Sequence, residues 1–413
     1  MARSPSHTQG IDVHTPTPSP SATSAAVTAV GAVTASGTSV AALFDDMLRG
    51  RRPFTEKEIP LVANAIPAPP GRAAESSGRV VFAAHVQAPL DLTEVVGARA
   101  ERAFGRDSRL LLYAMHIAGA APVVDADRTG VVLGTLRAGR NEYIAIHNAS
   151  AGTGGPVNPV WGPQSGYNAP AAQLSIHLPA RGPNLTLSSG ATAGLDAVVT
   201  GVQQVSMRVW DYVVAAGLDT LSAAAVEAGD ELAGPRGPYE PRPGDVPEGE
   251  AAAVLVLEDA PADDDRVLAR ILGTGRAAAA PGVDLARAAE EAVRAALRQV
   301  GCESAEVGLA VATAGGDRAA EAAERAALAV VFGKALPVCN ATGTTGRTGG
   351  ADGVLAVAVA VEALNRGVVP PIAGLRADPV PPAGPLALCL SVERGGNATA
   401  VLLGGAAERK AAA

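Results

Sequence analysis

The sequence has few of the side chains that usually carry out chemistry or cross-link a fold. Aromatic residues make up 3% of its 413 residues, and cysteine occurs only three times, at Cys302, Cys339 and Cys389, with no CxxC spacing. The three cysteines provide neither a disulfide framework nor a metal site, and we expect them to be buried as small hydrophobic side chains. With so few rings available, the core has to be built from Ala, Val and Leu.

Histidine is missing from more than half of the chain. All six histidines occur at or before His177, and the first two, His7 and His14, fall in a Ser/Thr/Pro-rich segment. A mechanism that needs an imidazole from the second half of the chain is therefore excluded.

Excess positive charge and long apolar runs are missing as well. The net charge of −8 argues against a nucleic-acid-binding protein, which would carry a basic stripe. The longest apolar run, 354–364, is shorter than a membrane span, and the first residues lack the charged-then-apolar pattern of a secretory signal. We expect a cytoplasmic protein that binds neither nucleic acid nor membranes.

The order of strand and helix signals divides the chain into a tail and two similar halves. Residues 1–24 are too poor in apolar side chains to order themselves and predict a disordered tail. Strand and helix signals then alternate, and the alternation restarts near residue 261. We expect an N-terminal half at 25–260 and a C-terminal half at 261–413, forming a layered α/β fold. Residues 51–80, rich in Pro and Arg, predict irregular structure.

Local signals place individual elements within this pattern. Ser39 precedes a helical apolar spacing that ends before Gly50, and Asp284 precedes another with apolar positions from Leu285 to Val300. Other segments predict a helix over 108–118, strands at 130–135 and 184–189, a helix over 191–207, and a helix over 352–365.

Several segments resemble one family in order and spacing. GPNLTLSSGATAGLDAV at 182–198 is similar to the nucleophile segment of β-ketoacyl synthases, and PVCNATGTTGRTGGADG at 337–353 to their late histidine-bearing loop. LALCLSVERGGNATAVLL at 386–403 resembles the closing glycine-rich turn. The resemblance covers about 26–405 and implies the duplicated thiolase fold, with layers α/β/α/β/α. It implies no cofactor.

The resemblance also assigns positions to the family's catalytic residues, and here each position carries another side chain. Ala191 stands at the cysteine that would hold the acyl group, Ala314 and Arg347 at the two histidines, and Thr342 at the lysine. The phenylalanine of the last turn aligns near Arg394. A methyl group cannot attack a thioester, so the sequence predicts no catalytic residue at these positions.

Three hydroxyl side chains and one arginine near these positions each allow more than one role. A hydroxyl needs a base to act as a nucleophile, and no histidine follows Ser188, Ser189 and Thr192 in the sequence. We therefore expect these hydroxyls to cap the helix or to satisfy backbone groups. Arg347 either holds an anion or forms a structural ion pair.

A ketosynthase body without its catalytic residues resembles the chain-length factor, the inactive partner subunit of type II polyketide synthases. The resemblance implies a heterodimer with an active ketosynthase, and contact with an acyl carrier protein through that complex. Two alternatives stay open. One is a malonyl-carrier decarboxylase or acyltransferase with an unrecognised site, and the other is a structural or carrier-docking homologue.

The resemblance further suggests where a chain-length gate would lie. The stretch RAGRNEYIAIHNAS aligns with the tunnel-lining helix of chain-length factors, and Arg140, Tyr143, Ile144 and His147 share one face if it is helical. Of these, Tyr143 or Ile144 is the side chain that an apolar acyl chain should meet, because removing the charge of Arg140 from water would be costly.

Overall fold

The architecture comes from a computed structural model, which describes residues 24–59, 79–150, 156–222, 246–261, 263–279, 284–333, 336–372 and 378–405. The predicted tail at 1–24 lies outside these ranges except for its last residue. No helix in these ranges is long and apolar enough to cross a membrane.

Ten strands form one hydrogen-bonded series in which the second half repeats the first. The N-terminal strands are β1 (Ala25–Val33), β4 (Thr129–Gly134), β5 (Asn184–Leu187), β6 (Tyr212–Asp219) and β7 (Ala251–Glu258). The C-terminal strands are β8 (Ala269–Ala278), β9 (Val307–Ala312), β10 (Val338–Cys339), β11 (Leu386–Val392) and β12 (Asn397–Gly405). Their orders are β5-β4-β6-β7-β1 and β10-β9-β11-β12-β8.

Strand directions repeat together with strand order. In each half the first three strands of the order run parallel, and the next two pairings are antiparallel. The two halves meet where β1 pairs with β8 over only three residue pairs, beginning at Ala25 and Ile271. The predicted boundary at 260/261 falls between β7 and β8. The duplicated fold expected from the sequence is confirmed.

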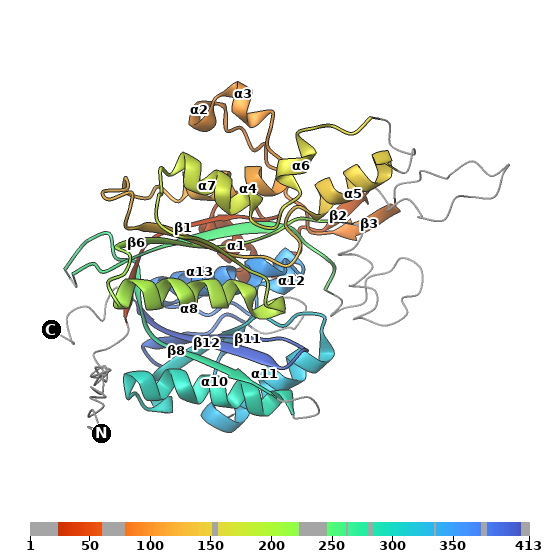
Figure 1. Cartoon of the computed structure of the whole chain (residues 1–413). Helices are drawn as coiled ribbons and strands as arrows, with labels where there is room; N and C mark the ends of the chain where they lie inside the picture. Colours follow the sequence, from red (N-terminus) through yellow and green to blue (C-terminus); the bar gives the residue numbers. More distant parts are fainter. Residues whose placement is uncertain are drawn as a thin grey trace, which may run out of the picture.

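Helices cover both sheets and also separate them, which gives five layers (Figure 1). Between the sheets lie α8 (Ala193–Ser206) and α13 (Gly350–Arg366), each of which contacts strands of both halves. The outer layers are formed on one side by α4 (Arg106–Ile117) and α7 (Ala169–His177), and on the other by α10 (Leu285–Val300) and α11 (Arg318–Phe332). The expected α/β/α/β/α layering is therefore present.

Small side chains allow the two central helices to pack closely. A Cβ added to Gly194 of α8 would lie 2.3 Å from the carbonyl oxygen of Gly350, and one on Gly353 of α13 would lie 2.3 Å from the nitrogen of Leu195. The surrounding core consists mostly of Ala, Val and Leu, as the shortage of aromatic residues requires.

Several local predictions agree with the structure in detail. Ser39 accepts the Ala42 N–H before α1 (Val40–Leu48), and Asp284 accepts the Ala286 N–H before α10. Cys339 and Cys389 are buried, and burial raises the pKa of the Cys339 thiol to about 12. Cys302 is only partly buried.

The expectation of irregular structure over 51–80 agrees with 51–54 and is wrong for 55–59 and 79–80. A separate antiparallel pair forms there from β2 (Thr55–Ile59) and β3 (Arg79–Ala83). Phe54 and Phe82 make an edge-on ring contact across this pair, with centroids 6.1 Å apart. Four of the five residues of β2 are exposed, so an apolar periodicity that would indicate a strand is absent.

The remaining elements surround the sheets. They are α2 (Thr93–Val96), α3 (Ala98–Glu101), α5 (Arg140–Ser150), α6 (Trp161–Gln164), α12 (Thr342–Thr345) and the short 3-10 turns η1 (Gly190–Thr192) and η2 (Ser304–Glu306). Both η1 and α12 lie at the positions that the sequence assigned to catalysis.

Candidate functional site

A chain of hydrogen bonds links the positions at which catalytic residues were sought. The Ser391 hydroxyl donates to the Ala191 carbonyl at 2.9 Å, and the Thr313 hydroxyl donates to Ser391 at 2.8 Å. Asn340 donates to the Ala314 carbonyl at 2.6 Å and accepts the Thr342 hydroxyl at 2.6 Å. The fold thus brings Ala191, Ala314 and Thr342 to one place from η1, from the end of β9 and from α12.

Ala191 lies in η1, ahead of α8, and its backbone N–H is engaged. The carboxylate Oε2 of Glu393, from the turn after β11, accepts this N–H. Backbone N–H groups at the start of a helix favour negative charge, and here a carboxylate of the chain itself supplies that charge.

The hydroxyls next to Ala191 bond within the chain. Ser189 and Thr192 both donate to Oδ2 of Asp196, and the Thr192 bond is 2.8 Å long. The oxygen Oδ1 of the same carboxylate accepts the Thr399 hydroxyl at 2.8 Å and lies 3.0 Å from Nε of Arg276. The hydroxyls of Ser189 and Thr192 are thus both hydrogen-bonded to the Asp196 carboxylate.

A buried carboxylate closes the Ala314 side of the site. Glu324, from α11, accepts the backbone N–H of Ala314 at 3.1 Å and that of Thr313 at 3.3 Å. Burial is the main influence on this carboxyl, and it raises the pKa of Glu324 to about 8. The group resists ionisation because the charged form would lie in a place without water.

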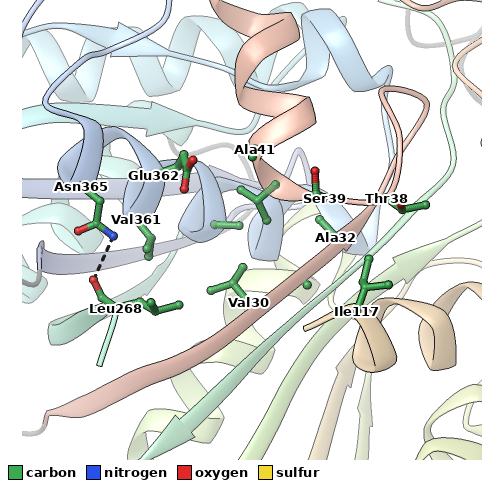
Figure 2. Close-up of a pocket in the computed structure, with 13 residues that line it drawn as sticks. Val30, Ala32, Thr38, Ser39, Ala41, Ile117, Leu268, Val361, Glu362 and Asn365 are labelled. Atoms are coloured by element: carbon green, nitrogen blue, oxygen red, sulfur yellow. Dashed lines mark hydrogen bonds between the residues drawn. The ribbon is translucent and has the colours of Figure 1, made fainter. Parts of the chain in front are cut away.

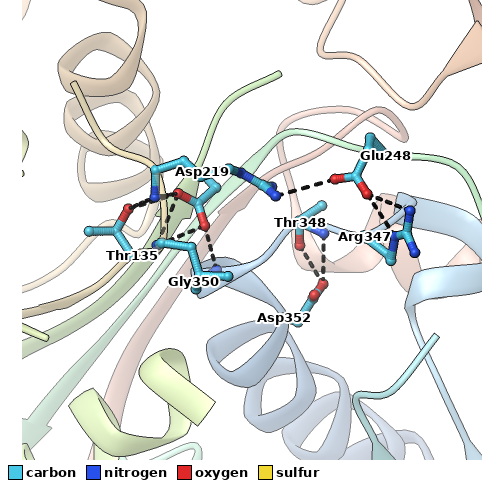
Figure 3. A network of polar contacts seen from close by, with 9 residues as sticks. Thr135, Asp219, Glu248, Arg347, Thr348, Gly350 and Asp352 are labelled. Atoms are coloured by element: carbon cyan, nitrogen blue, oxygen red, sulfur yellow. Dashed lines mark hydrogen bonds and ion pairs between the residues drawn. The ribbon is translucent and has the colours of Figure 1, made fainter. Parts of the chain in front are cut away.

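Arg347 belongs to a buried ion-pair network (Figure 3). Its Nε lies 2.7 Å from Oε1 of Glu248, and Nη1 of Arg137 lies 3.3 Å from the other oxygen of that carboxylate. Arg347 is only 8% exposed, so both charges of the pair are removed from water. Of the two roles that the sequence left open for Arg347, the ion pair is the one seen.

Two more carboxylates lie beside this network, and their environments differ. Asp219 accepts the Thr135 hydroxyl at 2.8 Å and the backbone N–H groups of Arg137 and Gly350, each at 2.7 Å. Asp352 accepts hydrogen bonds from the backbone N–H and the hydroxyl of Thr348, and burial raises the pKa of Asp352 to about 7. Backbone amides thus compensate the charge of Asp219 more fully than that of Asp352.

An open groove of about 650 Å³ runs next to η1. Its walls come from β5, α8, β8 and β12, and they include Ser188, Ser189, Arg276 and Asn397. A second cavity, of about 240 Å³, lies between β1, α1 and α13 (Figure 2). Its lining includes none of the positions assigned to catalysis.

The predicted gate segment is helical, as α5. Among the four predicted gate residues, Tyr143 is 61% exposed, Ile144 is 6% exposed, and Arg140 and His147 are intermediate. These residues therefore follow the border between the core and the surface of this chain. Which of these residues meets an acyl chain stays a prediction.

Sequence reasoning missed Glu393, Glu248 and Arg137. Glu393 directly precedes Arg394, the position aligned with the family's phenylalanine, so an acidic residue in that turn was the available signal. Nothing local marked Glu248 or Arg137, because each is paired only through the tertiary fold. In the described part of the chain, no group of three or more His, Cys, Asp or Glu is placed to hold a metal ion.

Comparison with known families gives two adjoining matches. Residues 22–261 match the family described as Beta-ketoacyl synthase, N-terminal domain, and residues 269–376 match Beta-ketoacyl synthase, C-terminal domain. The first match covers the N-terminal half, and the second covers the C-terminal half as far as residue 376, before β11 and β12.

Two curated relatives match part of this chain. A mycocerosic acid synthase-like polyketide synthase of Mycobacterium tuberculosis is 29% identical over 67% of this chain and 14% of its own length. Nodulation protein E of Rhizobium meliloti is 29% identical over 61% of this chain and 66% of its own. The chain thus spans less than two thirds of either relative.

A solved structure extends the likeness to nearly the whole fold. The complex of a ketosynthase with its chain length factor from Xenorhabdus doucetiae contains a chain that superposes with a TM-score of 0.76 at 23% identity. The superposition covers 92% of this chain and 98% of that one.

Proposed function

This chain belongs to the β-ketoacyl synthase family, and from that premise we propose that it is a non-catalytic subunit. It pairs with an active ketosynthase and helps to form the tunnel that holds the growing acyl chain, as a chain-length factor does. An acyl carrier protein reaches the pair through the active partner, in the cytoplasm.

The proposal rests on the identity of the residues at the candidate site. Ala191, Ala314 and Thr342 are joined by hydrogen bonds through Ser391, Thr313 and Asn340, yet the site contains no thiol and no imidazole. Condensation needs a nucleophile to carry the acyl group and donors to stabilise developing charge. The body of a ketosynthase is retained while the groups that react are replaced.

An exposed sheet edge supports the pairing. β5 ends the ten-stranded series and its outer edge has no partner strand among the described residues, while Leu185 on it is 37% exposed. The two helices that pack against β5 add apolar surface, with Ile176 on α7 and Met207 at the end of α8 largely exposed. Exposed strand edges bordered by apolar side chains are suited to pairing with another chain.

The main alternative, a malonyl-carrier decarboxylase, would need a cation available to substrate. Arg347 is the only basic residue among the four assigned positions, and its Nε is committed to Glu248 inside the protein. Release of Arg347 would leave the buried Glu248 carboxylate with the longer contact to Arg137, at 3.3 Å, so a structural role is favoured for Arg347.

Co-expression with a ketosynthase that retains its cysteine and both histidines tests the proposal. We expect the two chains to co-purify in equal amounts, and product to form only when both are present. A chain that remains a stable monomer beside that ketosynthase, or that condenses malonyl groups alone, would contradict it.

A further inference from the structure

Glu393 occupies the one backbone donor at the former nucleophile position, and it does so by a defined geometry. Its Oε2 accepts the N–H of Ala191, while Ser391, two residues earlier, donates its hydroxyl to the carbonyl of Ala191. Ser391 lies near the end of β11 and Glu393 follows in the turn, two residues on, so both side chains reach the same residue. The backbone of Ala191 is therefore bonded on both of its polar groups.

The neighbouring glycine makes room for this carboxylate. A Cβ on Gly190 would lie 2.2 Å from Oε2 of Glu393 and 2.5 Å from its carboxyl carbon, and Gly190 has a φ of +73°. The positive φ favours glycine there, and a Cβ would displace the Glu393 carboxylate from its place.

The turn that carries Glu393 is anchored on its other side. Arg394 donates from Nη2 to Asp317 at 2.9 Å and from Nε at 3.2 Å, and Asp317 is also the N-cap of α11. The Glu393 N–H donates to the Asn397 carbonyl at 2.7 Å across the turn. These contacts hold the turn that carries the carboxylate, and the Gly395 N–H donates to its Oε1 at 3.4 Å.

We infer that Glu393 is a permanent internal occupant of the donor site at Ala191, and that it excludes a substrate oxyanion from that site. The inference goes beyond the proposed function, because it identifies a second, independent block to catalysis. An oxyanion needs a free N–H, and here the N–H is engaged by a group of the same charge. Restoring a cysteine at position 191 would therefore not restore a ketosynthase site.

A thiol introduced at position 191 measures the block directly. The full-length variants Ala191→Cys and Ala191→Cys with Glu393→Gln are compared by the pH dependence of alkylation with iodoacetamide, followed on the peptide that contains residue 191. Glutamine keeps the shape of the side chain and removes its charge. We expect the thiol pKa to be lower by about one unit or more in the double variant, because a nearby carboxylate disfavours the thiolate.

A matched control and a second measurement keep the result interpretable. Glu94→Gln, in exposed α2, should leave the pKa of the introduced thiol unchanged. In the chain with Ala191 intact, Glu393→Ala should speed hydrogen exchange at residue 191 by about tenfold or more, since its N–H loses its acceptor.

Equal thiol pKa values with and without Glu393, or unchanged exchange at residue 191, would overturn the inference. Neither measurement involves a partner subunit or a product. A failure of heterodimer formation would therefore refute the proposed function and leave this inference standing.

Discussion

At the scale of single residues, the positions assigned to catalysis lie among side chains that are paired with one another. Glu248 joins Arg137 and Arg347, and Asp196 joins Ser189, Thr192 and Thr399. Buried charges are tolerated only when they are paired, and these groups find their partners on other elements of the fold. The pairings tie the candidate site to the surrounding core.

The first prediction concerns activity of the isolated chain. The purified protein should release no CO₂ from malonyl-carrier substrates and form no condensation product, because positions 191, 314 and 347 carry no thiol or imidazole. Release of radiolabelled CO₂ is the measurement. Malonyl-dependent release that disappears in Arg347→Ala would instead support the decarboxylase alternative.

The second prediction concerns the pH dependence of stability. The pKa of Glu324 is about 8 in the fold against an ordinary value of 4.5, so between these values the folded state binds more protons than the unfolded chain. The stabilising effect is complete below about pH 4.5 and is lost as pH rises through 8. Glu324→Gln should remove a decline of roughly 1 kcal/mol per pH unit between pH 6 and pH 8.

Urea denaturation at pH 6, 7, 8 and 9 measures this decline in the free energy of unfolding. Glu290→Gln, on α10 in the outer layer, is the control and should leave the slope unchanged. Burial also raises the pKa values of Asp107 and Asp352, to about 7, so these groups too lower the free energy of unfolding as pH rises. Part of the decline should therefore persist in Glu324→Gln. An unaltered slope in Glu324→Gln would show that this carboxyl ionises normally.

At the scale of elements, α5 is the segment on which a chain-length role depends. Tyr143 and Ile144 are neighbours in sequence, but one is 61% exposed and the other 6%. Truncating Ile144 would open a cavity in the core and cost about 2–5 kcal/mol, which would obscure any effect on product length. Tyr143 is therefore the cleaner test of the gate.

The third prediction is that Tyr143→Ala lengthens the product of the heterodimer without lowering its stability by more than about 0.5 kcal/mol. Product mass distribution and thermal unfolding are the two measurements. Tyr167→Ala, which removes another partly exposed tyrosine, is the matched control and should leave product length unchanged. A wild-type length distribution in Tyr143→Ala would remove Tyr143 from the gate.

Elements with local signals were predictable from the sequence, and those without were not. The helices after Ser39 and Asp284 were predictable because a cap and an apolar spacing lie within a few residues. The β2–β3 pair was missed because four of the five residues of β2 are exposed and its sequence shows no apolar periodicity. The positions assigned to catalysis were identified from the resemblance. The contacts around them were not predictable, because the partners are far apart in sequence: Glu393 and Ala191 by 202 positions, and Arg347 and Glu248 by 99.

At the scale of the whole molecule, the protein consists of two sheets with one strand order, joined through β1 and β8 over three residue pairs. Such a short backbone connection cannot hold the halves together alone. The helices α8 and α13, which contact both sheets, supply the rest of the interface. The candidate site lies at the starts of these helices, so its geometry depends on the alignment of the halves.

The fourth prediction concerns the outer edge of β5. Leu185→Lys should abolish co-purification with the ketosynthase partner while the chain keeps its fold, because a charge on an edge strand opposes the addition of another strand. Size-exclusion chromatography and circular dichroism distinguish loss of pairing from unfolding. Val380→Lys, at another exposed apolar position, is the control. Persistence of the heterodimer in Leu185→Lys would place the interface elsewhere.

The unequal ends of the strand series also limit how many copies can join. One end is β5, with four residues, and the other is β10, with only two. A two-residue strand provides too few unpaired backbone groups to add a further chain. If copies pair through β5, the pairing uses up both β5 edges, so the strand series of the described residues favours closed pairs over filaments.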